Sequence, residues 1–76
     1  MAIVDRIERN YFGVTLYVTA RTGRQYACKA VTWEDAPRGG LRVLTQTWPG
    51  YGRYQGWVML NRAERQAFFE AFELKV

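Results

Sequence analysis

The chain has 76 residues, with eleven Lys and Arg against seven Asp and Glu (formal net charge +4), one cysteine and no histidine. A chain of this length forms one small domain, the single Cys28 excludes an internal disulfide, and the lack of histidine excludes Ser-His and Cys-His catalytic pairs and His-containing zinc sites. With no secretory signal and no apolar run long enough to span a bilayer, we expect a soluble, cytoplasmic protein that is not an enzyme, has no membrane partner, and uses no cofactor, metal or small-molecule substrate.

Residues 1–10 mix Ile3, Val4 and Ile7 with charged side chains. This pattern fits an edge strand and a loose N-terminal arm equally well, so both interpretations stay open. Residues 11–20 alternate between apolar and more polar side chains, which is the period-two pattern of a half-buried strand. The expected inner side chains are Phe12, Val14, Leu16, Val18 and Ala20.

A turn at residues 21–23 joins this strand to a second one at residues 24–33, so the two strands form a hairpin. A three-residue loop with its glycine in the left-handed position pairs Leu16 with Cys28. A two-residue loop would place Leu16 opposite Lys29 and bury a charge, so we reject it. On the outer face we expect Tyr11, Tyr17, Gln25, Lys29, Val31 and Trp33, with Tyr11 and Trp33 as cross-strand neighbours.

The segment at residues 34–40, EDAPRGG, has the composition of a loop. A third strand follows at residues 41–48, and its alternation alone does not decide which side faces inward. A Pro-Gly pair ends that strand, and a glycine-containing loop leads to a fourth strand at residues 56–60. In the fourth strand we expect Val58 to face inward and Trp57 to face outward.

Residues 61–72 form the predicted helix. Asn61 is a strong N-cap residue, and Glu64 can reach back to its amide in a capping box. Phe69 points away from the apolar side of this helix, so it is either covered by a partner subunit or an ordinary exposed ring. The apolar side, which only the preceding sheet can cover, is expected to hold Ala63, Ala67, Phe68, Ala71 and Phe72.

The sequence therefore predicts a single α+β domain over residues 1–76. Its parts are the N-terminal arm or edge strand at residues 1–10, a four-stranded antiparallel sheet within residues 11–60, and the C-terminal helix at residues 61–72. The strand and helix order is ββββα.

Composition suggests two kinds of partner. Nine of the eleven cations are arginine, and the chain carries twelve aromatic rings, more than so small a core can easily bury. Single-stranded nucleic acid fits this composition, because its bases stack on side chains while cations follow its backbone. A protein interface fits as well, since Trp, Tyr and Arg dominate the residues that carry binding energy there.

Three motifs in order resemble the positive cofactor four family of transcriptional coactivators, especially its small bacterial members. The motifs are VTWEDAP, LTQTWPG and QGWVMLNRAERQAFFEAF, and the resemblance covers roughly residues 14–72. It implies a curved four-stranded sheet with a helix, dimerisation largely through the helices, and binding of single-stranded DNA across the sheet without strong sequence preference. Trp48 matches the third-strand tryptophan of the family, while Gln46 and Gln55 stand where the family usually has a cation.

We therefore predict a homodimeric single-stranded-DNA-binding protein, with RNA as a further possible ligand. The alternative is a small protein-interaction module, such as a phage- or plasmid-encoded inhibitor, that uses the same aromatic and arginine surface. The predicted nucleic-acid contacts are Tyr17, Arg24, Lys29, Trp33, Arg42, Gln46, Trp48, Arg53, Gln55 and Trp57. The predicted dimer interface consists of Ala67, Phe68, Phe69 and Phe72.

Overall fold

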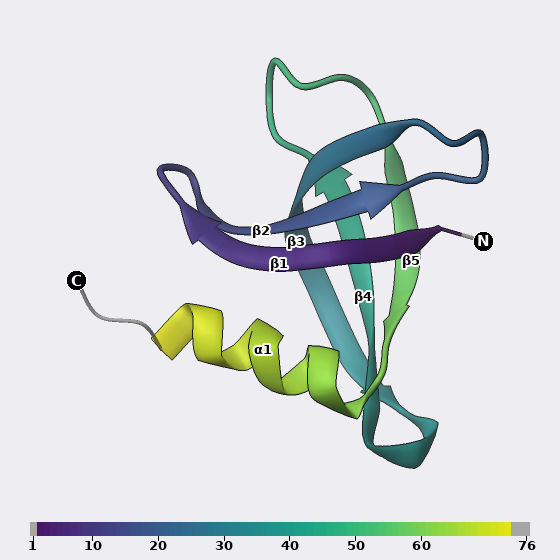
Figure 1. The fold of residues 1–76 in the computed structure, drawn as a ribbon, viewed down its shortest axis with the longest axis vertical. Coiled ribbons are helices and arrows are strands. Elements are labelled where there is room, and N and C mark those ends of the chain that lie inside the picture. Colours follow the sequence, from purple (N-terminus) through teal and green to yellow (C-terminus); the bar gives the residue numbers. More distant parts are fainter. Residues whose placement is uncertain (1, 74–76) are drawn as a thin grey trace.

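A computed structural model of the protein describes residues 2–73. It contains one antiparallel β-sheet followed by one α-helix (Figure 1). The strands are β1 (Ile3–Asn10), β2 (Gly13–Thr19), β3 (Gln25–Ala36), β4 (Gly40–Thr47) and β5 (Gln55–Leu60), and the helix is α1 (Arg62–Glu73). Strands that are neighbours in sequence are also neighbours in the sheet. The predicted α+β class is confirmed, but the sheet has five strands rather than four.

The fifth strand is β1, which resolves the choice left open for residues 1–10. It pairs with β2 along its length, from Ile3 opposite Thr19 to Asn10 opposite Gly13. The register shifts between Val4 and Arg6, so Asp5 forms a bulge. Because the bulge interrupts the alternation of β1, the period-two signal that identifies a strand is hidden in the sequence.

The hairpin between β2 and β3 has the predicted register. Leu16 lies opposite Cys28, and both side chains are fully buried. In the turn, the Gly23 N–H donates to the Ala20 carbonyl at 2.8 Å, and Gly23 has the left-handed φ of 90°. The start of β2 differs from the prediction, since Phe12 lies in the turn before the strand and is exposed.

The expected loop at residues 34–40 is largely strand, because β3 continues to Ala36 and only Pro37–Gly39 form a short 3₁₀ turn. Two acidic residues of this extension pair with arginines that lie outside it. Glu34 pairs with Arg42 across the β3–β4 ladder at 2.9 Å, and Asp35 pairs with Arg65 of α1 at 2.7 Å. Both partners lie outside residues 34–40, so the composition of that segment alone suggested a loop.

The helix begins as predicted, with a complete capping box. The Asn61 N–H donates to Glu64 Oε1 at 2.9 Å, and the Glu64 N–H donates to Asn61 Oδ1 at 2.8 Å. The helix packs on the inner side of the curled sheet, where it contacts β1, β2, β4 and β5 (Figure 1). The strands β1 and β5 at the two edges of the sheet also contact each other.

The buried side of the helix is rotated relative to the prediction. Phe68 and Ala71 are buried as expected, but Ala63 and Ala67 are exposed. Phe69, expected to point away, is partly buried against the core. Phe68, predicted at a dimer interface, is fully buried inside the domain and is therefore a core residue. The core consists of Val4, Val14, Leu16, Val18, Cys28, Leu41, Val43, Val58, Leu60, Phe68 and Ala71.

Candidate functional site

Most of the predicted contact residues that lie within strands share the face of the sheet turned away from the helix. Lys29 of β3 lies opposite Gln46 of β4, which lies opposite Gln55 of β5. Alternation along β4 and β5 then places Arg42 and Trp57 on the same face. We call this surface the outer face and define it as Lys29, Thr32, Glu34, Arg42, Leu44, Gln46, Gln55, Trp57 and Met59.

Trp57 is the exposed ring of the outer face. Its side chain is 42% exposed, and the Arg42 guanidinium lies over it at 4.6 Å from the ring centroid. Glu34 pairs with the same guanidinium at 2.9 Å. The ion pair and the cation–π contact together hold Arg42 beside an indole that water still reaches.

Trp48 lies at the end of β4 and has a structural role. Phe12 stacks on its ring at 5.7 Å between centroids, and its Nε1–H donates to Thr15 Oγ1 at 3.0 Å. Thr15 is fully buried, so this hydrogen bond satisfies a group that water cannot reach. The Lys29 ammonium lies 5.8 Å from the same ring. Trp48 therefore fastens the β1–β2 turn to β4, with a cation of the outer face beside it.

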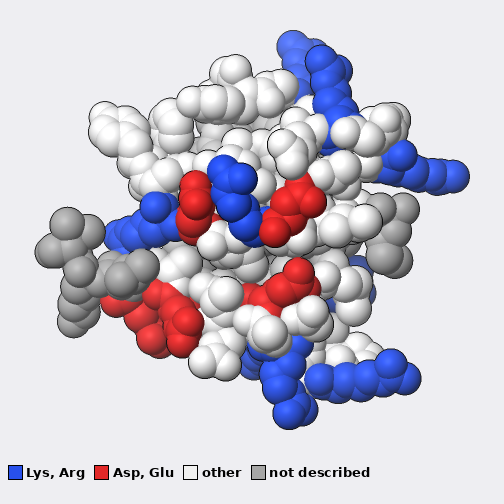
Figure 2. All heavy atoms as spheres, viewed as in Figure 1, with Lys and Arg blue, Asp and Glu red and all other residues white. Residues whose placement is uncertain are grey.

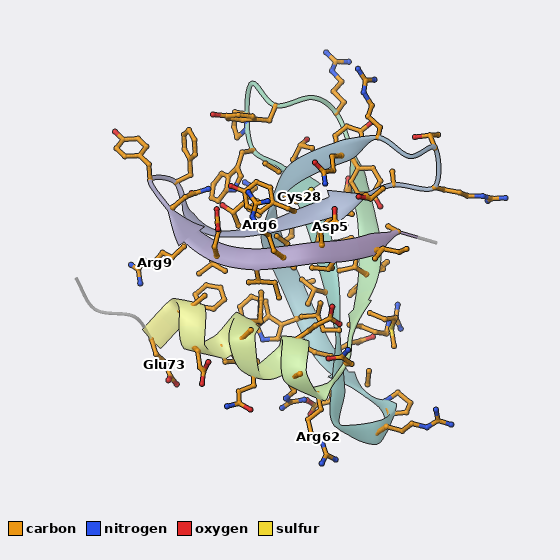
Figure 3. The ribbon with its side chains drawn as sticks, in the orientation of Figure 1. Asp5, Arg6, Arg9, Cys28, Arg62 and Glu73 are labelled. Atoms are coloured by element: carbon orange, nitrogen blue, oxygen red, sulfur yellow. The ribbon has the colours of Figure 1, made fainter. Side chains whose placement is uncertain are left out.

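Tyr17 projects from β2 and is engaged by β1. The Arg6 guanidinium carbon lies 3.9 Å from the centroid of its ring, and the Asn10 side-chain amide donates to its hydroxyl at 3.3 Å. Figure 3 shows Arg6 next to Asp5 on β1. The Tyr17 ring is thus partly covered by the protein's own cation.

Trp33 does not belong to the outer face, contrary to the prediction. The register of β3 shifts between Ala30 and Thr32, and this bulge reverses the alternation, so Trp33 lies opposite the buried Val43. Its ring contacts three phenylalanines of the helix, with centroid distances of 5.1–6.2 Å. The expected neighbour relation with Tyr11 therefore does not form.

Arg24 and Arg53 come together from two loops. Arg24 precedes β3 and Arg53 precedes β5, and both line one pocket. The wall of this pocket is tight, because a Cβ added to Gly52 would come within 3.3 Å of the Tyr26 ring. The other lining residues are Gln25, Tyr26, Tyr51 and Gly52.

Sequence reasoning missed three rings at the same end of the molecule. Tyr11 and Phe12 form the β1–β2 turn, and Tyr51 lies in the β4–β5 loop; their side chains are 96%, 47% and 51% exposed. The sequence signal for this turn is the pair Asn10 and Gly13. The Asn10 side chain accepts the Phe12 N–H at 2.9 Å, and Gly13 has a φ of 126°, which favours glycine.

The charged side chains are unevenly distributed. In the view of Figure 2, acidic and basic groups mix at the centre, acidic groups gather near the end of α1, and Lys and Arg project from the upper right and lower edges. Figure 3 shows Arg62 and Glu73 projecting from α1 away from the sheet.

Within residues 2–73, three titratable groups have pKa values shifted by their surroundings. Hydrogen bonds from Thr19 and then Gln25 lower the pKa of Asp5. Burial raises the pKa of the Cys28 thiol to about 11, and burial also raises the pKa of Tyr54. Cys28 is therefore a protonated, unreactive core residue at neutral pH.

Comparison with family models, curated proteins and solved structures finds no match for this chain. Within residues 2–73, no helix is long and apolar enough to cross a membrane. In the same part of the chain, no group of three or more His, Cys, Asp and Glu side chains could hold a metal ion. The basis for assigning a function is therefore the geometry of the outer face.

Proposed function

We propose that the protein binds single-stranded nucleic acid, with single-stranded DNA as its main ligand, on the outer face of β3–β5. The supporting observation is an exposed indole, Trp57, that shares one sheet face with two cations, Lys29 and Arg42. Bases stack on the ring while the cations contact phosphates, and the protein performs no chemistry of its own. The resemblance to the coactivator family points to the same ligand class.

The amides of Gln46 and Gln55 lie between the cation and the ring. Lys29, Gln46 and Gln55 form one row across three strands, and Trp57 follows two residues after Gln55 on the same face. An amide both donates and accepts, so it can bond a phosphate oxygen or a base edge without selecting one base. This row favours binding with little sequence preference.

A single strand is favoured over a duplex because stacking on Trp57 needs a base whose face is free. In a duplex both faces of each base are covered by its neighbours, and only cation–phosphate contacts remain. A duplex and a single strand can both contact the two cations of the outer face, but only a single strand can stack a base on Trp57. The stacking free energy of about 1–3 kcal/mol per base therefore favours the single strand.

The test is fluorescence anisotropy of a labelled, unstructured DNA oligonucleotide at low and at physiological salt, with duplex DNA and RNA as competitors. We expect binding that weakens with salt and is poorly competed by duplex. Trp57→Ala should weaken binding about 5- to 100-fold, and Lys29→Gln should weaken it with a shallower salt dependence. The matched controls are Ile3→Ala, which removes an exposed apolar side chain of β1, and Arg62→Gln, which removes a cation of α1.

A second candidate function is docking of a protein on the same face. It is favoured by Met59, which is 45% exposed on β5 beside Trp57 and contributes nothing to phosphate binding. Exposed Trp and Met with a neighbouring Arg are typical of protein interfaces. If the folded protein shows no affinity for any oligonucleotide at low salt, the first function is excluded and this one is retained.

We also propose that two copies associate on the helix side of the domain. Phe72 and Trp33 are 46% and 40% exposed there, with ring centroids 5.6 Å apart. Phe69 and Ala67, two predicted interface residues, lie on the same helix. This arrangement leaves the outer face of each copy free for its ligand.

A further inference from the structure

Three exposed rings meet at one end of the sheet. Tyr11 and Phe12 of the β1–β2 turn have centroids 5.5 Å apart, and Phe12 lies 5.7 Å from Tyr51 of the β4–β5 loop. We call these three residues the loop-end cluster. Phe12 also stacks on Trp48. The cluster is therefore built from two loops that are far apart in sequence and joined through the Phe12 ring.

The loop-end cluster is held in place by polar contacts. The Asn10 side-chain oxygen accepts the Phe12 N–H at 2.9 Å, and its amide nitrogen donates to the Tyr17 hydroxyl at 3.3 Å. These bonds fix the turn that presents Tyr11 to solvent, where 96% of its side chain is exposed. The core gains nothing from a ring in that position, and clustered exposed rings mark binding surfaces.

Two unpaired cations lie next to the cluster. Tyr51 also lines the pocket that contains Arg24 and Arg53, and no acidic side chain lines that pocket. Within residues 2–73, neither arginine forms an ion pair. Aromatic faces beside free guanidinium groups match the two parts of a nucleotide, the base and its phosphate.

We infer that the loop-end cluster is a second subsite for the same nucleic-acid strand. One base stacks on the exposed rings, and its phosphate lies between Arg24 and Arg53. This inference rests on the proposed function. The path to the outer face is continuous, because Trp48 contacts Phe12 on one side and has Lys29 at 5.8 Å from its ring. The excess of positive charge favours a nucleic acid over a peptide at this end.

The test compares oligothymidylates of about 4 and about 16 nucleotides, the range of lengths bound by one single-strand-binding domain. The longer strand should span both subsites and bind more tightly. The double variant Tyr11→Ser/Tyr51→Ser should weaken binding of the longer strand about 5- to 100-fold and remove most of the advantage of length. The double variant Arg24→Gln/Arg53→Gln should reduce the slope of affinity against salt by about 1.

Two controls and a fold check accompany these variants. Ile3→Ser removes an exposed apolar side chain at the far end of β1, and Arg62→Gln removes a cation from the helix; both should bind like the wild type. Circular dichroism checks the fold of each variant. In a parallel measurement on the wild type, photocrosslinking of an iodouracil-containing strand should label Tyr11 or Tyr51.

The outcomes separate this inference from the proposed function. If the tyrosine variant binds both strands like the wild type while Trp57→Ala weakens both, the second subsite is excluded and the proposed function stands. Crosslinks confined to β4 and β5 would lead to the same conclusion. If the wild type binds neither strand at low salt, the proposed function fails, and the loop-end subsite fails with it.

Discussion

Asp5 links three strands through one carboxylate. Its Oδ2 accepts the Thr19 hydroxyl at 2.5 Å and the Gln25 side-chain amide at 2.9 Å, and the bulge in β1 places it at this position. These bonds, that of Thr19 first, favour the ionised form and lower the pKa of the carboxyl in the folded state. The bulge that hides β1 in the sequence therefore also supplies a contact that secures β1 to the sheet.

The lowered pKa of Asp5 predicts the direction in which stability changes with pH. A carboxyl whose pKa is lower in the folded than in the unfolded state stabilises the fold above its unfolded pKa, near 4, and loses this contribution as the pH falls through the folded pKa. In the Asp5→Asn variant, the urea midpoint should therefore decrease less steeply as the pH falls below about 4. Thr19→Val should act in the same direction, and an unchanged acid limb in both variants would contradict the role of this contact.

Trp48 and Trp57 show how different two tryptophans of one small sheet can be. Trp48→Ala should lower the free energy of unfolding by about 2–4 kcal/mol, because it removes a packed ring and leaves the buried Thr15 hydroxyl without its donor. Trp57→Ala should change stability by less than about 1 kcal/mol, since Trp57 lies on the surface and is 42% exposed. Urea denaturation of both variants tests the contrast, and equal losses would contradict it.

At the scale of elements, the N-cap of α1 gives a clean prediction. Asn61→Ala should lower the free energy of unfolding by about 0.5–2 kcal/mol, because it leaves the Glu64 N–H without its acceptor. Asn61→Ser should retain most of the stability, since serine caps equally well. Thermal unfolding measures the difference, which corresponds to about 4–8 °C per kcal/mol in a domain of this size. Equal midpoints for the two variants would show that the capping box is not needed.

Elements defined by local chemistry were predictable from the sequence. The β2–β3 register and the start of α1 depend on residues a few positions apart, and both are confirmed. The β3 extension was not predictable, because Glu34 and Asp35 pair with Arg42 and Arg65, which lie outside the segment whose composition indicated a loop. Bulges hid β1 and misplaced Trp33, since one extra residue reverses the alternation that assigns a side chain to a face.

The candidate site was predictable in part for the same reason. Gln46, Gln55, Trp57 and Lys29 share the outer face because the strands that carry them are regular through those positions. Trp33 moved to the helix side because of the bulge next to it, and the loop-end cluster was missed because it is formed by two loops. Contacts between loops depend on the curl of the whole sheet, which no local pattern encodes.

At the scale of the whole molecule, the two faces of the sheet have different roles. The inner face packs on α1, while the outer face and the loop end carry exposed rings and cations, of which Arg42 is paired with Glu34. The proposed association on the helix side predicts a mass of twice the 8.9 kDa of one chain. Sedimentation should show that dimer for the wild type, and Phe72→Glu should yield monomers because it places a charge in the apolar contact. Ile3→Glu is the control, and a wild type that stays monomeric at high concentration excludes the interface.

The order of the strands has a consequence for synthesis. In this meander each strand pairs with the one made just before it, so hairpins can assemble as the chain emerges. The side chains that seal the inner face, Phe68 and Ala71, are translated only after all five strands. The nascent sheet therefore exposes an apolar surface until the helix leaves the ribosome, and exposed apolar surface of this kind is prone to aggregation.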